Sequence, residues 1–293
     1  MSTNSTTLKL TFRLGTVDKI TYMNTEQKLK TTDFFATHPI FSLDEAVNVM
    51  TPGGKRISIV DRLKYHLKTG RLKRVTREIY AVVPPAVSVE NFRPDPLMVA
   101  HAMQPAGIFS HHSALELLGA AHSVWNQYTL YITRRRRPLL LDGVTIRFLE
   151  NPLPIQPESR QQVGTRRIER HGRLLEVTGP ERTLVEGFSR PSLVGGLEEL
   201  VHSAAGFTTL DLELLEEVLH LYDLAKLWAA TGWFLERFQK SFHVPDALLT
   251  LMEQRRPRSR VYIERHQRGG ILVPRWNLIL PKGLLSPGEP DEH

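Results

Sequence analysis

The hydrophobic and polar positions of residues 31–85 predict three short helices followed by two strands. TTDFFATHP and SLDEAVNVM have apolar residues at helical spacing, and Ser42 precedes Glu45 by three residues, the pattern of a capping box. Ser58 is expected to cap the third helix, SIVDRLKYHLKTG, which Gly70 ends. The runs RLKRV and IYAVV then predict a hairpin. This order is that of a winged helix-turn-helix.

The third helix has two different faces when its residues are placed at intervals of 100°. Its apolar residues share one arc and are expected to pack on the other two helices: Ile59, Val60, Leu63 and Leu67. The opposite arc is polar and holds Asp61, Arg62, Tyr65, Lys68 and Thr69. A helix in a DNA major groove presents such a face to base edges and phosphates, although a solvated helix surface has the same pattern.

Residues 91–285 predict a mixed α/β domain with a largely helical C-terminal half, so the fold class is α/β (α+β). QYTLYIT and GVTIRFLE predict strands, GPERTLVEGF and later runs predict helices, and Gly269-Gly270 predicts the turn of a last hairpin. The Pro-rich stretch VVPPAVSVENFRPDP separates this domain from a DNA-binding domain over 31–90. The remaining parts are an N-terminal extension, 1–30, and a polar tail, 286–293.

The net charge of the chain is concentrated in the predicted third helix and hairpin. The 293 residues carry 38 Lys and Arg against 31 Asp and Glu, a net charge of +7. Residues 55–78 hold nine basic and two acidic side chains, also +7, so the rest of the chain is neutral. Charge confined to one short stretch indicates a surface for a polyanion, and we expect double-stranded DNA as the partner.

The expected DNA contacts all come from this stretch. They are Lys55, Arg56, Ser58, Arg62, Tyr65, Lys68, Arg71, Lys73, Arg74 and Arg77. Arg62, Tyr65 and Lys68 are expected to face the bases, and the cations of the hairpin are expected to contact phosphates.

A second basic surface is also expected in the larger domain. Arg134, Arg135, Arg136 and Arg137 lie between two predicted strands, where four consecutive side chains cannot all face one way. They form either a solvated loop or, together with further arginines, a surface for nucleic acid. The further arginines are Arg160, Arg166, Arg167, Arg170 and Arg173.

Composition excludes several classes of site. The chain has no Cys, which excludes disulfides, zinc-thiolate sites and thiol nucleophiles. The first residues lack the pattern of a signal peptide, and no segment reaches the ~18 apolar residues of a membrane span. We therefore expect a cytoplasmic protein without a membrane partner.

Candidate catalytic and metal-binding residues are few. TPGGKR lacks the spacing of a phosphate-binding loop. His111 and His112 are adjacent, so on a helix their side chains diverge by about 100° and do not readily chelate one metal. These two, with His101 and His122, are expected to be caps or packing residues. The sequence thus predicts no catalytic residue, no metal and no cofactor.

Four segments in this order resemble the AbiEi antitoxin family of bacterial type IV toxin-antitoxin, or phage abortive-infection, systems. They are GRLKRVTREIYAVVP (70–84), FSHHSALELLG (109–119), YTLYITRRRR (128–137) and LEVTGPERTLVEGFSRPSLVGGLEEL (175–200). The chain departs from the family at the wing turn, where the family often has Gly and this sequence has Glu78. A further departure is the extension of about 30 residues before the first helix, which the resemblance does not cover.

The resemblance implies a winged helix-turn-helix that represses the operon encoding it, and a C-terminal domain that counters a nucleotidyltransferase-like toxin. It also implies that antitoxin and toxin form no stable complex. Two other functions stay open from the residues alone. One is an enzyme that cleaves or modifies nucleic acid, targeted by the winged helix. The other is a transcription factor whose second domain senses a small molecule, which would require a cavity.

Overall fold

The structure is a computed structural model that describes residues 31–52, 55–264 and 269–285. The expected N-terminal extension and polar tail lie outside these residues. The chain divides into two compact units, Met1–Phe92 and Arg93–His293. Within each unit helices and strands are mixed, which confirms the α/β (α+β) class.

The first unit has the element order of a winged helix-turn-helix. Residues 31–37 are helical, and the elements that follow are β1 (Ile40–Ser42), α2 (Leu43–Met50), α3 (Arg56–Lys68), β2 (Leu72–Thr76) and β3 (Ile79–Val82). The strands form an antiparallel sheet in the order β1-β3-β2. Helices 31–37, α2 and α3 and the hairpin β2–β3 agree with the expectation, whereas β1 was not predicted by the hydrophobic pattern.

The apolar face of α3 forms the core of this unit, as its periodicity predicts. Ile59 and Leu63 are buried against Phe34, Phe41 and other apolar side chains. The hydroxyl of Ser42 accepts a hydrogen bond of 3.1 Å from the Glu45 amide, which confirms the expected cap of α2.

The expected cap of α3 is wrong. The helix begins at Arg56, two residues before Ser58, and Lys55 occupies the cap position without a side-chain bond. The Ser58 hydroxyl instead donates to the Lys55 carbonyl at 2.7 Å, so it serves the first turn from inside the helix. A Ser can satisfy a local backbone group from either position, and sequence spacing does not distinguish them.

The tip of the β2–β3 hairpin is a tight turn with strained backbone. Glu78 has φ 65°, in the left-handed region that favours Gly. The ladder is irregular between Arg74 and Thr76, which indicates a β-bulge beside the turn. The Gly that the resembled family often has at this place would adopt the same conformation without the cost of a side chain.

The second unit contains a six-stranded sheet in the order β6-β7-β5-β4-β9-β8. Its strands are β4 (Ile108–Phe109), β5 (Gln127–Ile132), β6 (Leu139–Leu141), β7 (Val144–Glu150), β8 (Thr165–Arg170) and β9 (Arg173–Thr178). β5 is parallel to β7 and β4 to β9, whereas the other neighbours are antiparallel. The two shortest strands, β4 and β6, were not expected.

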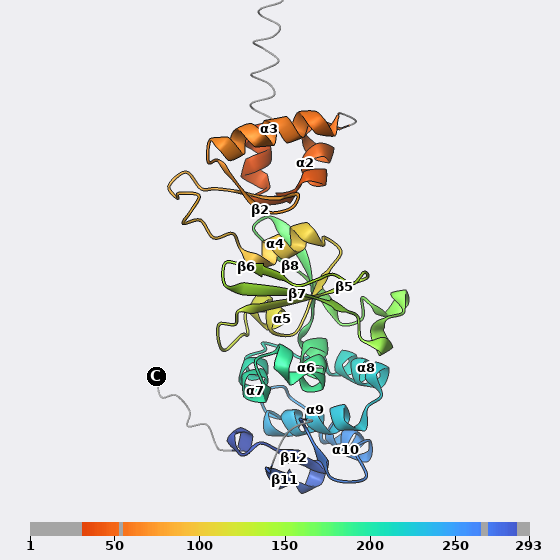
Figure 1. The fold of residues 1–293 in the computed structure, drawn as a ribbon. Helices are drawn as coiled ribbons and strands as arrows, with labels where there is room; N and C mark the ends of the chain where they lie inside the picture. Colours follow the sequence, from red (N-terminus) through yellow and green to blue (C-terminus); the bar gives the residue numbers. More distant parts are fainter. Residues whose placement is uncertain (1–30, 53–54, 265–268, 286–293) are drawn as a thin grey trace, which may run out of the picture. The chain divides into compact units, whose positions relative to one another are not determined.

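Helices account for most of the chain after β9. The helices of this unit are α4 (Pro96–Met103), α5 (His112–Leu117), α6 (Pro180–Ser189), α7 (Leu197–Ala205), α8 (Leu212–Tyr222), α9 (Ala225–Arg237) and α10 (Asp246–Gln254). α6 packs on β9 and on α7, α8 and α9, so it joins the sheet to the helical half (Figure 1). Its sequence has Pro180 in the first turn, where a missing N–H costs nothing.

The hairpin expected on Gly269-Gly270 is wrong. A small sheet forms instead in the order β10-β12-β11, from Val261–Tyr262, Leu278–Leu280 and Ile271–Val273. β10 is parallel to β12, and the antiparallel hairpin is the pair β11–β12. The turn of that hairpin ends at Asn277, which has φ 51°, a left-handed conformation that Asn tolerates.

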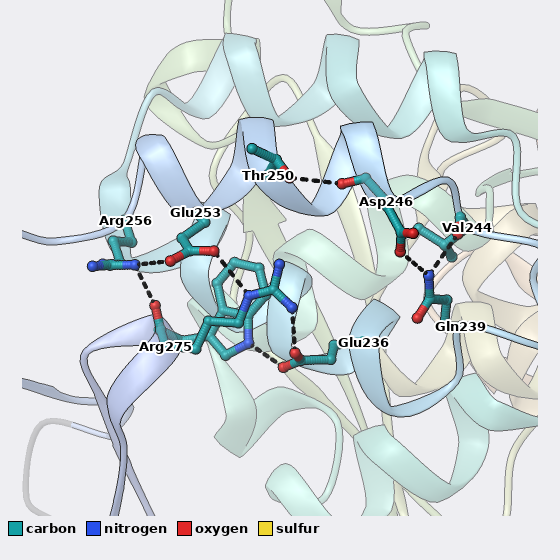
Figure 2. Close-up of polar contacts among 9 residues, drawn as sticks. Glu236, Gln239, Val244, Asp246, Thr250, Glu253, Arg256 and Arg275 are labelled. Carbon is teal, nitrogen blue, oxygen red and sulfur yellow. Dashed lines mark hydrogen bonds and ion pairs between the residues drawn. The ribbon is translucent and has the colours of Figure 1, made fainter.

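Arg275 ties this small sheet to α9 and α10. Its Nη1 donates to Glu236 of α9 at 2.5 Å and its Nε donates to Glu253 of α10 at 2.9 Å, as Figure 2 shows. Arg256 also donates to Glu253, at 2.5 Å, and to the Arg275 carbonyl, at 2.7 Å. The Trp276 indole donates to Glu236 at 2.6 Å, so both carboxylates have two partners.

No helix in the described part of the chain is long and apolar enough to cross a membrane.

Candidate functional site

The solvent-facing side of α3 carries the side chains expected to face DNA. Tyr65 is 64% exposed, and Lys68 and Thr69 beside it are exposed as well. Asp61 is exposed and accepts from Lys64 at 2.9 Å, one turn along the same helix. Tyr65 and Lys68 therefore offer a phenol and an ammonium group to a partner, with an acidic group one turn away.

Arg56, at the start of α3, is held by two acidic side chains. Its guanidinium contacts Asp44 of α2 through Nη1 and Glu78 of the wing turn through Nη2, the latter at 2.7 Å. The hydrogen bonds that Arg56 donates to Asp44 and Glu78 raise its pKa. This expected DNA contact thus joins α2, α3 and the wing turn, and it places the tip of the wing beside the first turn of α3.

Two further expected contacts are turned partly inward. Arg62 is half-buried and donates weakly to the Thr31 hydroxyl, at 3.5 Å. The guanidinium of Arg71 stacks over the Phe35 ring, 5.1 Å from its centre. Burial lowers the pKa of His66, and the positive charges of Arg71 and Arg62 lower it further, which places both cations around this side chain.

The wing presents its remaining cations unequally. Lys73 is half-buried and donates to the Phe92 carbonyl at 2.7 Å. Arg74 is exposed and makes one long backbone bond, to the Thr76 carbonyl at 3.4 Å, and Arg77 is exposed at the turn itself. Of the ten expected DNA contacts, six are exposed without an acidic partner among the described residues: Lys55, Ser58, Tyr65, Lys68, Arg74 and Arg77.

The four consecutive arginines lie in the loop between β5 and β6. Arg134, Arg135, Arg136 and Arg137 are all exposed. Arg136 stacks over the Phe148 ring at 5.4 Å, whereas Arg135 lies beside a surface pocket that Asn151 and Arg190 also line. The loop is therefore open to a partner over its whole length.

The arginines of β8, unlike those of the loop, form ion pairs with acidic side chains. Arg166 pairs with Glu181 at 3.1 Å and Arg167 with Glu176 at 2.6 Å, so acidic neighbours compensate both charges. Arg170 likewise pairs with Asp95 at 2.6 Å. β8 is an edge strand three strand spacings from β5, about 14 Å. Acidic neighbours thus compensate Arg166, Arg167 and Arg170, whereas Arg134–Arg137 and the exposed Arg160 form no ion pair among the described residues, and the second basic surface stays a prediction.

A buried polar cluster in the second unit was not anticipated. Glu186 of α6 accepts hydrogen bonds from Tyr131 of β5 at 2.9 Å and from Tyr222 of α8 at 2.7 Å. Arg182 of α6 donates to the same carboxylate at 2.7 Å and to the Gln161 and Val163 carbonyls at 2.8 and 3.1 Å. Glu186 and Arg182 are both buried, so each charge depends on the other.

The ionisation of the cluster follows from its burial. Burial raises the pKa of Tyr131 and of Tyr222, and the negative charge of Glu186 raises both further. Burial alone would lower the pKa of Arg182, but the Glu186 carboxylate raises it overall. The two phenols therefore stay protonated, which is the form in which they donate to Glu186.

His111 completes the wall of the cluster. It is fully buried, has φ 54° and stands just before α5. Its Nδ1 lies 2.9 Å from the Ser110 hydroxyl, whereas its Nε2 has no hydrogen-bond partner among the described residues. Burial lowers its pKa to about 4, opposed by Glu186 and aided by Arg190 and Arg182. His111 is thus a neutral imidazole at pH 7.

Sequence reasoning missed this cluster although one signal for it is present. Arg182 and Glu186 are four residues apart in GPERTLVEGF, on the side of α6 that also carries apolar residues. Charged residues on an apolar face indicate a buried pair. Their tyrosine and histidine partners come from three other elements, and no spacing along the chain reveals them. Among the described residues, no group of three or more His, Asp or Glu side chains is arranged to hold a metal ion.

Comparison with known proteins shows a likeness in fold. No family model matches the chain, and no curated protein matches it. Among solved structures, the crystal structure of the RV2827C protein from Mycobacterium tuberculosis is similar, with a TM-score of 0.56 and 16% sequence identity. The match covers 87% of this chain and 91% of that one. At this identity the likeness shows a shared fold alone.

Proposed function

We propose that this chain is a DNA-binding transcriptional regulator that uses α3 and the β2–β3 wing as its interface. The observation that carries the proposal is the grouping of exposed side chains on these two elements. Tyr65 and Lys68 stand on the solvent face of α3, and Arg74 and Arg77 are exposed on the wing. A winged helix binds DNA with these two parts, the helix in the major groove and the wing along the backbone.

The electrostatics of the first unit support this interface. The bond between Arg56 and Glu78 holds the wing turn beside the start of α3, so that Lys55 and Arg77 flank the same junction. Because Arg56, Arg71 and Lys73 are occupied within the protein, fewer cations than the sequence suggested are free to neutralise phosphates. We expect Lys55, Lys68, Arg74 and Arg77 to supply most of the salt-dependent affinity.

The resemblance to AbiEi antitoxins extends the proposal. On that basis the chain acts in the cytoplasm, represses the operon that encodes it and uses its second unit to counter a nucleotidyltransferase-like toxin without forming a stable complex. The exposed loop Arg134–Arg137 is the first place to seek that activity, since its charges have no acidic partner among the described residues.

Binding to DNA fragments tests the central claim. Purified full-length protein is titrated with labelled fragments from upstream of its own reading frame and with shuffled fragments, at several salt concentrations. We expect tighter binding to the upstream fragment by at least about 10³-fold, the lower end for specific recognition. Equal affinity for both fragments would remove the regulator proposal. Incubation of the same fragments and of RNA with Mg²⁺ tests the alternative, an enzyme acting on nucleic acid, by the appearance of cleaved or modified product.

The loop variant separates the two activities. Replacement of Arg134 to Arg137 by Ser is assayed for operator binding and for growth rescue in cells that express the toxin encoded alongside. Lost rescue with intact operator binding is the expected result. Intact rescue would show that these arginines are only a solvated loop and take no part in countering the toxin.

A further inference from the structure

Ile57 is an exposed apolar side chain in the first turn of α3. It is 67% exposed, whereas Ile59 and Leu63 of the same helix are buried in the core of the first unit. Among the described residues, the apolar cluster of that core does not include Ile57. A β-branched side chain also loses freedom in a helix, so Ile57 adds neither packing nor helix stability. Single exposed apolar residues are common, and the surroundings of Ile57 therefore decide what it does.

Ile57 lies on the face of α3 that the proposed function assigns to DNA. At about 100° per residue, Ile57, Asp61 and Lys68 fall within an arc of about 40°. All three are exposed, and the exposed Tyr65 stands beside them on the same side of the helix. Ile57 is thus the N-terminal member of this row of side chains. The N-terminal residues of a recognition helix are those that contact base edges.

The charges around Ile57 favour a base edge over the phosphate backbone. Asp61, one turn along the helix, pairs with Lys64 at 2.9 Å, so the two charges compensate each other. Positive charge without an acidic partner among the described residues lies instead toward both ends of the row, on Lys55 and Lys68. Phosphates are therefore attracted to the two ends, and the stretch at Ile57 is left for the bases.

The first turn of α3 is also the part of the helix that adjoins the wing turn. Arg56, the residue before Ile57, donates to Glu78 of the wing turn at 2.7 Å. The exposed Arg77 of that turn therefore stands at the same end of α3. A duplex that contacts both Arg77 and the solvent face of α3 passes over the first turn, where it meets Ile57.

The chemistry of an isoleucine side chain selects one kind of base edge. The side chain has no donor or acceptor, so it does not read the hydrogen-bonding pattern of guanine, adenine or cytosine. Thymine presents its C5-methyl group in the major groove, where an apolar side chain contacts it. Removal of one methyl-sized group from water is worth about fourfold in affinity. Thymine is therefore the base that Ile57 suits.

We infer that Ile57 is a specificity-determining residue that contacts the C5-methyl group of a thymine in the operator. The inference rests on the proposed DNA-binding function and adds to it one base that the protein distinguishes. No hydrogen bond takes part in this contact. Loss of the methyl group alone should therefore remove the preference for thymine at the base pair that faces the first turn of α3.

Uracil substitution tests the inference on the full-length protein. Each thymine of a bound upstream fragment is replaced in turn by deoxyuridine, which lacks the methyl group and keeps the base pair. We expect at least one position at which the affinity of the parent falls about fourfold in competition titrations. Ile57→Ala should bind the thymine fragment about fourfold more weakly than the parent does, and should bind the thymine and uracil forms of that position equally.

A matched variant separates this contact from other effects of the methyl group. The methyl group also changes the shape and stiffness of DNA, but that effect is the same for every variant. Val124→Ala removes another exposed apolar side chain, 98% exposed in the second unit, and should keep the full preference for thymine. Because Ile57 is itself exposed, Ile57→Ala should retain the fold, which urea denaturation checks.

Two results would overturn the inference while the regulator proposal stands. One is specific binding of the upstream fragment with no position at which uracil weakens it. The other is an Ile57→Ala variant that still prefers thymine to uracil at the position that the parent distinguishes. Equal affinity of the parent for upstream and shuffled fragments would instead remove the regulator proposal, and this inference with it.

Discussion

Arg56 in the first turn of α3 and Glu78 at the tip of the wing are joined by a hydrogen bond of 2.7 Å between Nη2 and Oε1. The bond links two parts of the first unit that a DNA duplex would have to meet together. Glu78 has φ 65°, a backbone conformation that glycine adopts at lower cost. The charged hydrogen bond to Arg56 offsets that cost, which explains why a glutamate can occupy this turn position.

Glu78→Gly and Glu78→Gln separate the backbone from the side chain at this turn. Both remove the carboxylate that faces Arg56, but only the glycine relieves the positive φ. We expect the Gly variant to exceed the Gln variant in free energy of unfolding by about 1 kcal/mol, and both variants to bind DNA more tightly than the parent because Arg56 gains freedom to contact phosphate. Chemical denaturation and DNA titration measure the two effects. Equal stability of the two variants would show that the turn carries no strain.

Tyr65→Ala tests the solvent face of α3. The side chain is 64% exposed, so the free energy of unfolding should change by less than about 0.5 kcal/mol. Operator affinity should fall by about 1 to 3 kcal/mol if the phenol contacts bases. Ile59→Ala on the buried face serves as the contrast, with an expected loss of about 2 to 5 kcal/mol in stability. Unchanged operator affinity in Tyr65→Ala would remove this part of α3 from the interface.

The wing cations differ in the salt dependence that they should confer. Replacing exposed Arg74 and Arg77 together by Gln should flatten the slope of log affinity against log salt by about 1.8, or 0.9 for each phosphate contact. Arg71→Gln should leave the slope unchanged and lower stability instead, because its guanidinium is stacked on Phe35. DNA titrations at several salt concentrations measure the slope for each variant. A flattened slope in Arg71→Gln would mean that the arginine leaves Phe35 when DNA binds.

The buried pair Arg182–Glu186 should be sensitive to the loss of one partner. Arg182→Met leaves Glu186 as an uncompensated buried charge and should cost about 3 to 5 kcal/mol of stability. The double variant Arg182→Met, Glu186→Leu should recover part of that loss, because no charge then stays buried. Tyr222→Phe, which removes one bond to the carboxylate, should cost about 1.5 to 3 kcal/mol. A double variant no more stable than Arg182→Met would contradict this account.

His111 predicts how stability depends on pH. Its pKa is lowered to about 4, below the 6.5 of an exposed histidine, chiefly by burial and also by Arg190 and Arg182, with Glu186 opposing. The unfolded chain therefore takes up the proton first as the pH falls, and stability is complete above pH 6.5 and is lost progressively toward pH 4. The full contribution is about 3 kcal/mol. His111→Asn should show a smaller decrease between these pH values in urea denaturation at stepped pH. Parallel curves for parent and variant would assign the pH dependence to carboxylates elsewhere.

The elements that the sequence predicted correctly are long enough to show a hydrophobic pattern, and α3 is the clearest example. Ile59 and Leu63 recur at helical spacing, and both are buried in the structure. β1, β4 and β6 have only two or three residues, too few to show an alternating pattern. The hairpin at Gly269-Gly270 was misassigned because packing, and not the local sequence, determines which strands pair. In the structure β12 lies between β10 and β11 and pairs with both.

The candidate site was likewise predictable from the sequence only in part. Exposure of Tyr65 and Lys68 follows from the helix period, so the sequence alone indicated it. The engagement of Arg56 by Asp44 and Glu78 depends on the approach of three elements, which no local pattern contains. The buried cluster around Glu186 likewise exists only after β5, α6 and α8 have assembled.

The clamp around Arg275 has a consequence for the order of folding during synthesis. Glu236 and Arg275 are 39 residues apart, so at about 5 to 20 residues per second the ribosome needs about 2 to 8 seconds to reach the second after the first. Gly232 of α9 faces the Trp276 ring so closely that an added Cβ would lie 2.3 Å from it, and until Trp276 is made this surface of α9 has no indole to cover it. We expect nascent chains in that interval to be the ones that chaperones hold and that aggregate when synthesis stalls.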